Sequence, residues 1–166
     1  MALALLLIVG CSYASAAVDK VTSSTQLTLD TPSRAYPVAT LLDVGIPTLN
    51  DGLYLTDEDD TVFPEVRYAE AIYFSNQLGK VLEKSGAWGA IRVTPSDDVI
   101  MDLYISGTIY QSDGETLDLE ITARDSSGTE WFSQRYKQTT GKYAYDRRLK
   151  SLGDPFQNLF IRIAND

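Results

Sequence analysis

The sequence predicts one α+β domain: a βαβ unit followed by a three-stranded antiparallel meander, one amphipathic helix packed on a mixed sheet, and a second, short helix at the C-terminus. Three observations predict this fold. Apolar residues recur at helical spacing in 64–86, between two β-like segments. Apolar and polar residues then alternate through 103–137, interrupted by two glycine-containing turns. Finally, Asp154-Pro155 precedes apolar residues at helical spacing.

The βαβ unit begins with residues 37–47, which are apolar, partly β-branched and bounded by prolines. They predict a first strand that is buried on both faces. Pro64 suits the first turn of the helix, and Gly86 suits its end in a left-handed turn. Charged residues, Arg67 among them, fall largely off the apolar stripe of this helix. The stripe consists of Ala71, Phe74, Leu78, Val81 and Leu82. Residues 87–94 complete the unit as a short strand.

The meander follows from strict alternation. Every second residue is apolar or glycine in 103–109 and apolar in 117–123, so one face of each strand is buried and the other is polar. Turns are expected at 112–114 and 126–128, and 129–137 forms the third strand. In the C-terminal helix, Asp154 is the expected N-cap and the following proline the first helical residue.

Composition excludes several classes of function. The 166 residues include 14 Lys+Arg and 23 Asp+Glu, and the net charge of −9 argues against non-specific nucleic-acid binding. The chain has no histidine, which excludes Ser-His-Asp and Cys-His catalysis and removes the commonest zinc ligand. A single cysteine excludes an internal disulfide and any CxxC motif. We therefore expect a protein that is not an enzyme and that binds no cofactor and no metal.

Two acidic clusters were weighed as metal or acid–base sites. Residues 57–60 lack the ligand spacing of a calcium loop, and they are interpreted as a solvated loop before the helix. Asp97 and Asp98 lie in an expected turn, and Asp102 lies on the polar face of a strand. We interpret these three residues as solvated carboxylates.

The N-terminus contains a targeting signal. Residues 2–10 form an apolar run that is too short to span a membrane, but its length fits the apolar core of a secretory signal. Residues 8–11, Ile-Val-Gly-Cys, resemble the bacterial lipobox, in which the cysteine is diacylated and the preceding peptide is removed. Cys11 is thus the predicted lipidation site, and Ser12 beside it implies an outer-membrane destination. The sequence departs from the pattern in having no Lys or Arg before Cys11.

Two other interpretations of this segment stay open. Residues 14–16, Ala-Ser-Ala, form a possible cleavage site that would release a soluble periplasmic or secreted protein. Alternatively, the apolar run is a buried strand or the start of a helix. The lipoprotein interpretation divides the chain into a signal peptide at 1–10, a lipidated Cys11 with a flexible tether at 11–36, and a single periplasmic domain at 37–166.

Candidate interface residues come from the aromatic and basic side chains. Tyrosines and arginines are typical of protein interfaces, although sheet propensity explains the tyrosines nearly as well. Residues 135–150 carry six cations against one Asp and could contact anionic lipid or an acidic partner, or could form an ordinary solvated loop. The candidates are Tyr104, Tyr110, Tyr136, Tyr143, Tyr145, Arg147, Arg148 and Lys150.

The order of elements resembles small bacterial envelope lipoproteins with a domain like the N-terminal domain of TolB, and also LptE-type and ABC-transport auxiliary lipoproteins. The residues that carry the resemblance are 78–86 with 88–93, then 103–109, and 117–125 with 127–129. The resemblance implies a periplasm-facing accessory or assembly factor of an envelope complex that works through protein contacts. The alternative is a lipid- or glycan-binding module in envelope transport, with its site between the helix and the open edge of the sheet.

Overall fold

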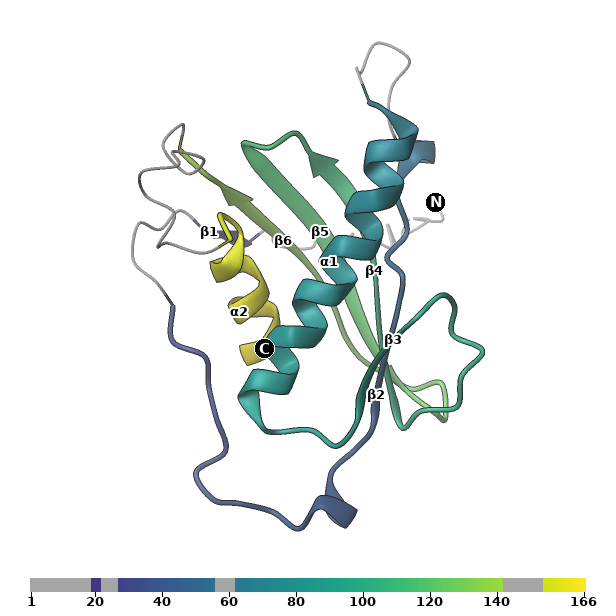
Figure 1. Cartoon of the computed structure of the whole chain (residues 1–166), viewed down its shortest axis with the longest axis vertical. Coiled ribbons are helices and arrows are strands. Elements are labelled where there is room, and N and C mark those ends of the chain that lie inside the picture. Colours follow the sequence, from purple (N-terminus) through teal and green to yellow (C-terminus); the bar gives the residue numbers. More distant parts are fainter. Residues whose placement is uncertain (1–18, 22–26, 56–61, 142–153) are drawn as a thin grey trace, which may run out of the picture.

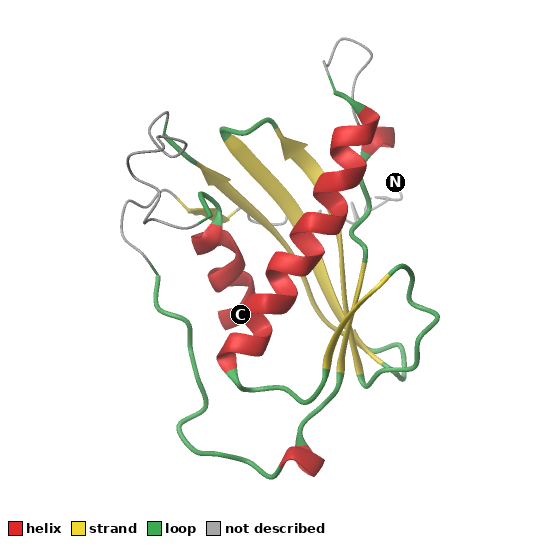
Figure 2. Ribbon diagram, in the orientation of Figure 1, coloured by secondary structure: helices red, strands yellow, loops and turns green. Residues whose placement is uncertain are grey.

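The computed structural model describes residues 19–21, 27–55, 62–141 and 154–166, and these build a sheet with two helices packed on one face (Figure 1). Figure 2 shows the two helices side by side in front of the strands. The helices are α1, Pro64–Ser85, and α2, Gln157–Asn165, with 3₁₀ turns η1, Val38–Thr40, and η2, Leu53–Leu55. The strands are β1 Asp19–Val21, β2 Val44–Pro47, β3 Ile91–Thr94, β4 Leu103–Ser112, β5 Thr116–Asp125 and β6 Glu130–Thr139.

The sheet has the strand order β1-β6-β5-β4-β2-β3. β2 pairs in parallel with both β3 and β4, and α1 makes the connection from β2 to β3, which is the predicted βαβ unit. β4, β5 and β6 form the predicted antiparallel meander, and β1 pairs in parallel with β6. The α+β fold class is therefore confirmed.

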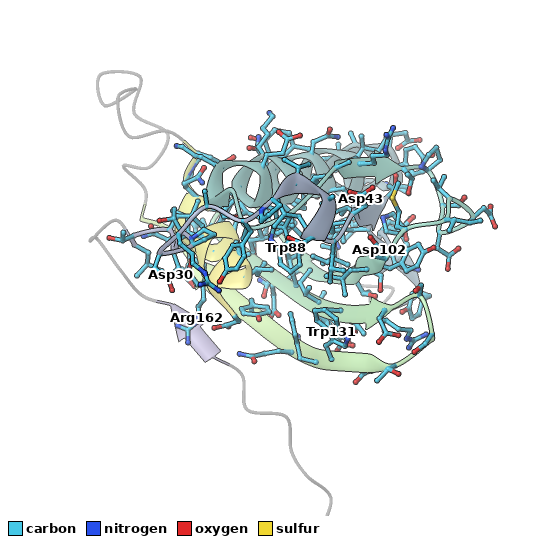
Figure 3. The ribbon with its side chains drawn as sticks, turned by 90° about the horizontal axis from the view of Figure 1, so that it is seen from below. Asp30, Asp43, Trp88, Asp102, Trp131 and Arg162 are labelled. Carbon is cyan, nitrogen blue, oxygen red and sulfur yellow. The ribbon has the colours of Figure 1, made fainter. Side chains whose placement is uncertain are left out.

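β2 is shorter than the strand predicted at 37–47. Pro37 instead begins the turn η1, because its carbonyl oxygen accepts hydrogen bonds from both the amide and the hydroxyl of Thr40, at 2.9 and 2.7 Å. The strand starts after Asp43, whose amide donates to the Asp102 carboxylate at 2.8 Å (Figure 3). All four residues of β2 are buried, as expected for a strand covered on both faces.

Helix α1 has the predicted limits. Pro64 is its first residue, and Gly86 adopts a left-handed conformation with φ 66° immediately after its end. The whole predicted apolar stripe is buried. The prediction for Arg67 was wrong, since this side chain is buried at 4% exposure. It is tolerated there because Glu70 pairs with it and two backbone carbonyls accept from its guanidinium.

β3 begins at Ile91, four residues later than predicted. The amides of 89–90 turn away from the sheet to bind the chain before β2: Gly89 donates to the Leu42 carbonyl at 2.8 Å, and Ala90 donates to the Asp43 carboxylate at 2.7 Å. A Cβ at position 89 would collide with that carboxylate, so the close approach requires glycine.

The short helix α2 packs beside α1, where the rings of Phe74 and Phe160 lie 6.0 Å apart. Asp154 is not the N-cap that the sequence predicts, because Phe156 holds that position without a side-chain cap. The Asp154 carboxylate accepts instead from the Phe156 amide at 2.7 Å, in the turn before the helix. The regular helix then starts two residues after Pro155, at Gln157. Its apolar residues complete the core between the helices and the sheet.

The predicted tether, 11–36, lies against the domain over much of its described part. β1 pairs with β6, and Leu27 and Leu29 pack against the core. The Leu27 amide also donates to the side chain of Asn158 at 2.9 Å. The Asp30 amide donates to the side chain of Asn165, which donates in turn to the Thr28 carbonyl, so residues 27–30 lie along α2. Cys11 and the rest of 1–18 lie outside the described residues. Within the described part of the chain, no helix is long and apolar enough to cross a membrane.

Candidate functional site

A cleft of about 580 Å³ lies between the first turns of α1 and the end of β4. Its apolar wall comes from the start of α1 and consists of Val62, Phe63 and Val66. Its polar wall comes from β4, the turn after it, β5 and β6, and consists of Tyr110, Gln111, Ser112, Asp113, Asp118, Arg135 and Lys137. Arg67 and Glu70 complete the lining. The cleft therefore lies where the start of α1 approaches the end of β4, a strand that lies between β5 and β2 in the sheet.

A β-bulge in β4 shapes the polar wall. The β4–β5 register shifts between Ile109 and Gln111, so that Tyr110 is an extra residue without a partner in the register. A bulge of this kind redirects the side chains that follow it. After the shift, Ser112 faces α1, and its hydroxyl donates to the Glu70 carboxylate at 2.8 Å.

Asp118 is the buried charge at the base of this wall, with 1% exposure. Its carboxylate is held by two cations of β6. Arg135 donates from Nε to Oδ1 at 2.7 Å and from Nη2 to Oδ2 at 3.2 Å, and Lys137 Nζ lies 3.1 Å from Oδ2. Lys137 also donates to the Gln111 side chain at 3.0 Å. The cluster is therefore fixed on three sides by hydrogen bonds.

Tyr110 extends this network toward solvent. The guanidinium of Arg135 lies over its ring, 3.8 Å from the centroid, and its hydroxyl donates to Glu120 at 3.0 Å. This hydrogen bond to Glu120, with burial, raises the pKa of the Tyr110 hydroxyl above 10.0. The Asp118 hydrogen bonds raise the pKa of Arg135 in turn. Both groups keep their protons at neutral pH, so neither one serves as a base.

Arg67 holds the helical wall against the sheet. Its guanidinium lies 3.3 Å from Glu70 and donates to the backbone oxygens of Asp51 and Ser112, both at 3.4 Å. One side chain thus joins the loop before η2, the first turn of α1 and the last residue of β4. These contacts hold the first turn of α1 at a fixed distance from the end of β4, and they therefore fix the width of the cleft.

The chemistry available in the cleft is that of binding. Three cations and three carboxylates line it, and each contacts a polar partner described above or, for Asp113, the Gln111 amide at 2.7 Å. Within the described residues, no group of three His, Cys, Asp or Glu side chains is placed to hold a metal ion. The cleft combines hydrogen-bond donors and acceptors with apolar side chains, which is the usual composition of a ligand site.

The structure separates the tyrosines that were predicted as interface residues. Tyr110 lines the cleft. Tyr104 stabilises the loop at 95–101, since its hydroxyl donates to the Val99 carbonyl at 2.9 Å and accepts from the Met101 amide at 3.0 Å. The proposal of Tyr136 as an interface residue was wrong, because this side chain is 0% exposed and pairs with Leu119 on the core side of the sheet. Burial raises its pKa.

The structure describes part of the predicted basic segment, residues 135–150. Arg135 and Lys137, two of its cations, are occupied by Asp118 instead of facing a partner. The remaining predicted residues lie in 142–153, outside the described residues: Tyr143, Tyr145, Arg147, Arg148 and Lys150. Sequence reasoning missed Asp118, although a signal existed. A hairpin turn at 126–128 places the acids of β5 opposite the bases of β6.

A second surface was also missed. The side of α1 that faces away from the sheet exposes large apolar residues, and we call it the outer face of α1. Its members are Tyr68, Ile72 and Tyr73, with exposures of 62%, 41% and 45%. Exposed apolar residues grouped in this way are typical of protein contact surfaces.

Comparison with solved structures supports the fold. The chain matches a PelC variant from Paraburkholderia phytofirmans, described as a dodecamer, with a TM-score of 0.50 and 15% sequence identity over 87% of this chain and 92% of that one. It also matches the hypothetical protein CT253 from Chlamydia trachomatis, with a TM-score of 0.46 and 11% identity over 74% of this chain and 90% of that one. No protein-family model and no curated protein matches the sequence. The likeness to PelC is therefore one of fold.

Proposed function

We propose that this chain is a non-enzymatic lipoprotein, anchored in the bacterial outer membrane through Cys11, that serves as an accessory or assembly factor of a cell-envelope complex. It faces the periplasm and works through protein contacts. The observation that carries the proposal is the fold shared with PelC across most of both chains, because PelC forms a dodecamer. The lipobox-like residues 8–11 supply the predicted anchor.

The outer face of α1 is the contact surface that we assign to assembly. Tyr68 and Ile72 lie one turn apart on this face, and both are more than two-fifths exposed. Tyrosine and large aliphatic side chains supply most of the apolar area that protein interfaces bury. We therefore expect copies of this chain to associate through α1, with the opposite side of the helix left in the core.

The test is the mass of the full-length chain in detergent, measured by sedimentation velocity and native mass spectrometry. We expect a multiple of the mass of the mature, lipidated chain that begins at Cys11, and we expect Ile72→Lys to shift it toward the monomer. Ile100→Lys makes the same change at a 92% exposed side chain outside α1, and this control should leave the assembly intact. A monomer at every concentration, with no crosslink to an envelope protein in intact cells, would contradict the proposal.

A second candidate function is a lipid- or glycan-binding module in envelope transport. The cleft favours this function, because its volume lies in the range of small-molecule sites and its walls combine apolar and polar groups. The two functions use different surfaces, so one protein can carry both.

A further inference from the structure

We propose that two copies of this chain pack α1 against α1 as an antiparallel pair, related by a two-fold axis that passes between Ile72 and Tyr73. This inference rests on the proposed function, and it adds the orientation and the register of the contact. Three features carry it: an exposed stripe along the helix, the complementarity of that stripe with itself, and the position of the β1 edge of the sheet.

A stripe of exposed residues runs along α1 from its first turn to its last. Its members recur at steps of three or four residues, which places them on one side of the helix, opposite the buried side that packs in the core. Figure 2 shows α1 in front of the strands, with no described element lying over it. This side is therefore open to a second molecule. We call it the exposed stripe of α1, and it consists of Glu65, Ala69, Ile72, Asn76, Lys80 and Glu83.

The middle of the stripe fits a second α1 that runs in the opposite direction. With the axis between Ile72 and Tyr73, each Ile72 meets Tyr73 of the second copy. Both side chains are more than two-fifths exposed, so the contact removes an aliphatic group and an aromatic ring from water. The Tyr73 hydroxyl donates to Asp154, which fixes the ring in place before any contact forms. Ala69 meets Asn76 of the second copy, and the small side chain leaves room for the longer one.

The charged residues of the stripe are complementary in the same register. Glu65 lies as far before the axis as Lys80 lies after it, so each Glu65 faces Lys80 of the second copy. A crossing angle of about 20° keeps two helices in contact over this length. Within the described part of the chain, neither residue has an ion-pair partner, so both are available to a second copy. A parallel pair would instead set Glu65 beside Glu65 and Lys80 beside Lys80.

The β1 edge of the sheet gives an independent reason for the antiparallel orientation. The sheet runs from β1 to β3, and α1 lies along its strands on one face, so the axis of an antiparallel pair points across the strands (Figure 1). Rotation about that axis leaves the direction from β3 to β1 unchanged. Both β1 edges then face the same way, as two copies anchored in one bilayer through Cys11 require. A parallel pair has its axis along α1, which turns the two β1 edges to opposite sides.

The orientation is tested by disulfide crosslinking of the full-length, lipidated chain in detergent. Ala69→Cys and Asn76→Cys are made as separate variants, and the predicted lipid occupies the thiol of Cys11. We expect a mixture of the two variants to form the mixed disulfide at least about tenfold faster than either variant links to itself. Self-linking of Ala69→Cys that outpaces the mixed product would show a parallel pair and overturn the proposal. Equal rates for all three products would show random collision and would also overturn it.

The register is tested by reversing the two charges. Glu65→Lys and Lys80→Glu should each weaken association about tenfold in sedimentation velocity, because each variant sets like charges together at two places. The variant with both reversals restores opposite charges, so we expect an affinity within about twofold of the native chain. This recovery also excludes a loss of fold, which a second substitution would not repair. Glu115→Lys is the matched control, since it reverses an exposed carboxylate outside α1 and should leave the affinity unchanged.

A double reversal that associates as weakly as the single reversals would overturn the register, as would single reversals that assemble like the native chain. Failure here is distinguishable from failure of the proposed function. If Ile72→Lys breaks the assembly while the crosslinking and charge tests fail, copies associate through α1 in another arrangement and the proposed function stands. A native chain that stays a monomer at every concentration overturns this inference as well.

Discussion

The guanidinium of Arg135 donates two hydrogen bonds to the carboxylate of Asp118, from Nε to Oδ1 at 2.7 Å and from Nη2 to Oδ2 at 3.2 Å. The two residues come from neighbouring strands, and Asp118 is 1% exposed while the Arg135 side chain is 33% exposed. The carboxylate therefore depends on the protein for its partners, whereas the cation does not.

This asymmetry predicts that Arg135→Met lowers the free energy of unfolding by about 2 kcal/mol, because it leaves a buried carboxylate with Lys137 as its remaining cation. Urea denaturation measures the change. The matched control is Arg124→Met, at the exposed ion pair with Glu130, and it should cost less than about 0.5 kcal/mol. Equal costs at the two positions would show that the Asp118 pairing contributes no more than a surface ion pair.

Two glycines with the same backbone conformation predict different costs of substitution. Gly52 and Gly86 have φ of 67° and 66°. A Cβ at Gly86 meets nothing within 4 Å, so Gly86→Ala should cost about 1 kcal/mol from left-handed strain alone. A Cβ at Gly52 would collide with the Ile109 carbonyl oxygen. Gly52→Ala should therefore cost at least about 2 kcal/mol and disturb the β4 bulge, as thermal melts and amide shifts of 108–112 would report. Equal melting temperatures for the two variants would contradict this explanation.

The turn before β6 predicts sensitivity to acid. The Ser127 hydroxyl donates to Asp125 at 2.6 Å, and amide and indole donors add to it, so the pKa of Asp125 lies below its ordinary 3.8. A carboxyl with a lowered pKa contributes stability above pH 3.8, and that contribution is lost as the pH falls below it through the pKa of the folded state. Asp125→Asn should thus reduce the fall in melting temperature between about pH 4 and about pH 2.

The same melting measurements test whether another carboxyl, and not Asp125, causes the loss of stability in acid. Asp97→Asn, on an exposed loop, is the control and should leave the pH dependence as it is. An Asp125→Asn profile parallel to that of the native chain would show that other carboxyls carry the acid response. Asp113 is a candidate: burial raises its pKa, but hydrogen bonds from Thr116, Gln111 and Glu115 outweigh this and lower it.

We expect the Cys11→Ser variant to be released from the membrane, because serine offers no thiol for acylation. Fractionation of cells and intact-mass measurement check this. The native chain should carry lipid and begin at Cys11, whereas the variant should stay unprocessed and leave the outer-membrane fraction. Cleavage after Ala16 in the native chain would instead favour the soluble alternative. A variant that remains in the membrane with unchanged processing contradicts the anchor.

Local patterns predicted much of the fold. The limits of α1 follow from Pro64 and Gly86, and the meander follows from alternation in β4 and β5, since both signals lie within a few residues of the structure that they specify. The prediction for 37–43 failed because it depends on distant partners. Asp43 binds Ala90 and Asp102, and no periodicity records those contacts.

The candidate site was less predictable for the same reason. β6 has Gln134, Tyr136 and Gln138 on its core side, and these side chains do not distinguish a buried face from an exposed one. Pairing with the clearly alternating β5 is what assigns Tyr136 to the core. Arg67 likewise required knowledge of the ends of β4 and η2, which meet it from 45 and 16 residues away in the sequence.

The pairing of β1 with β6 has a consequence for the membrane geometry. Seven residues lie between Cys11 and Asp19, the first residue of β1, so eight Cα-to-Cα steps join the two. A fully extended chain of this length reaches at most about 28 Å. With lipid on Cys11, this short connection would therefore hold the domain close to the bilayer. The point of attachment would be β1, at the edge of the sheet. Copies anchored this way share one height and one edge toward the lipid, which reduces their search for each other to two dimensions.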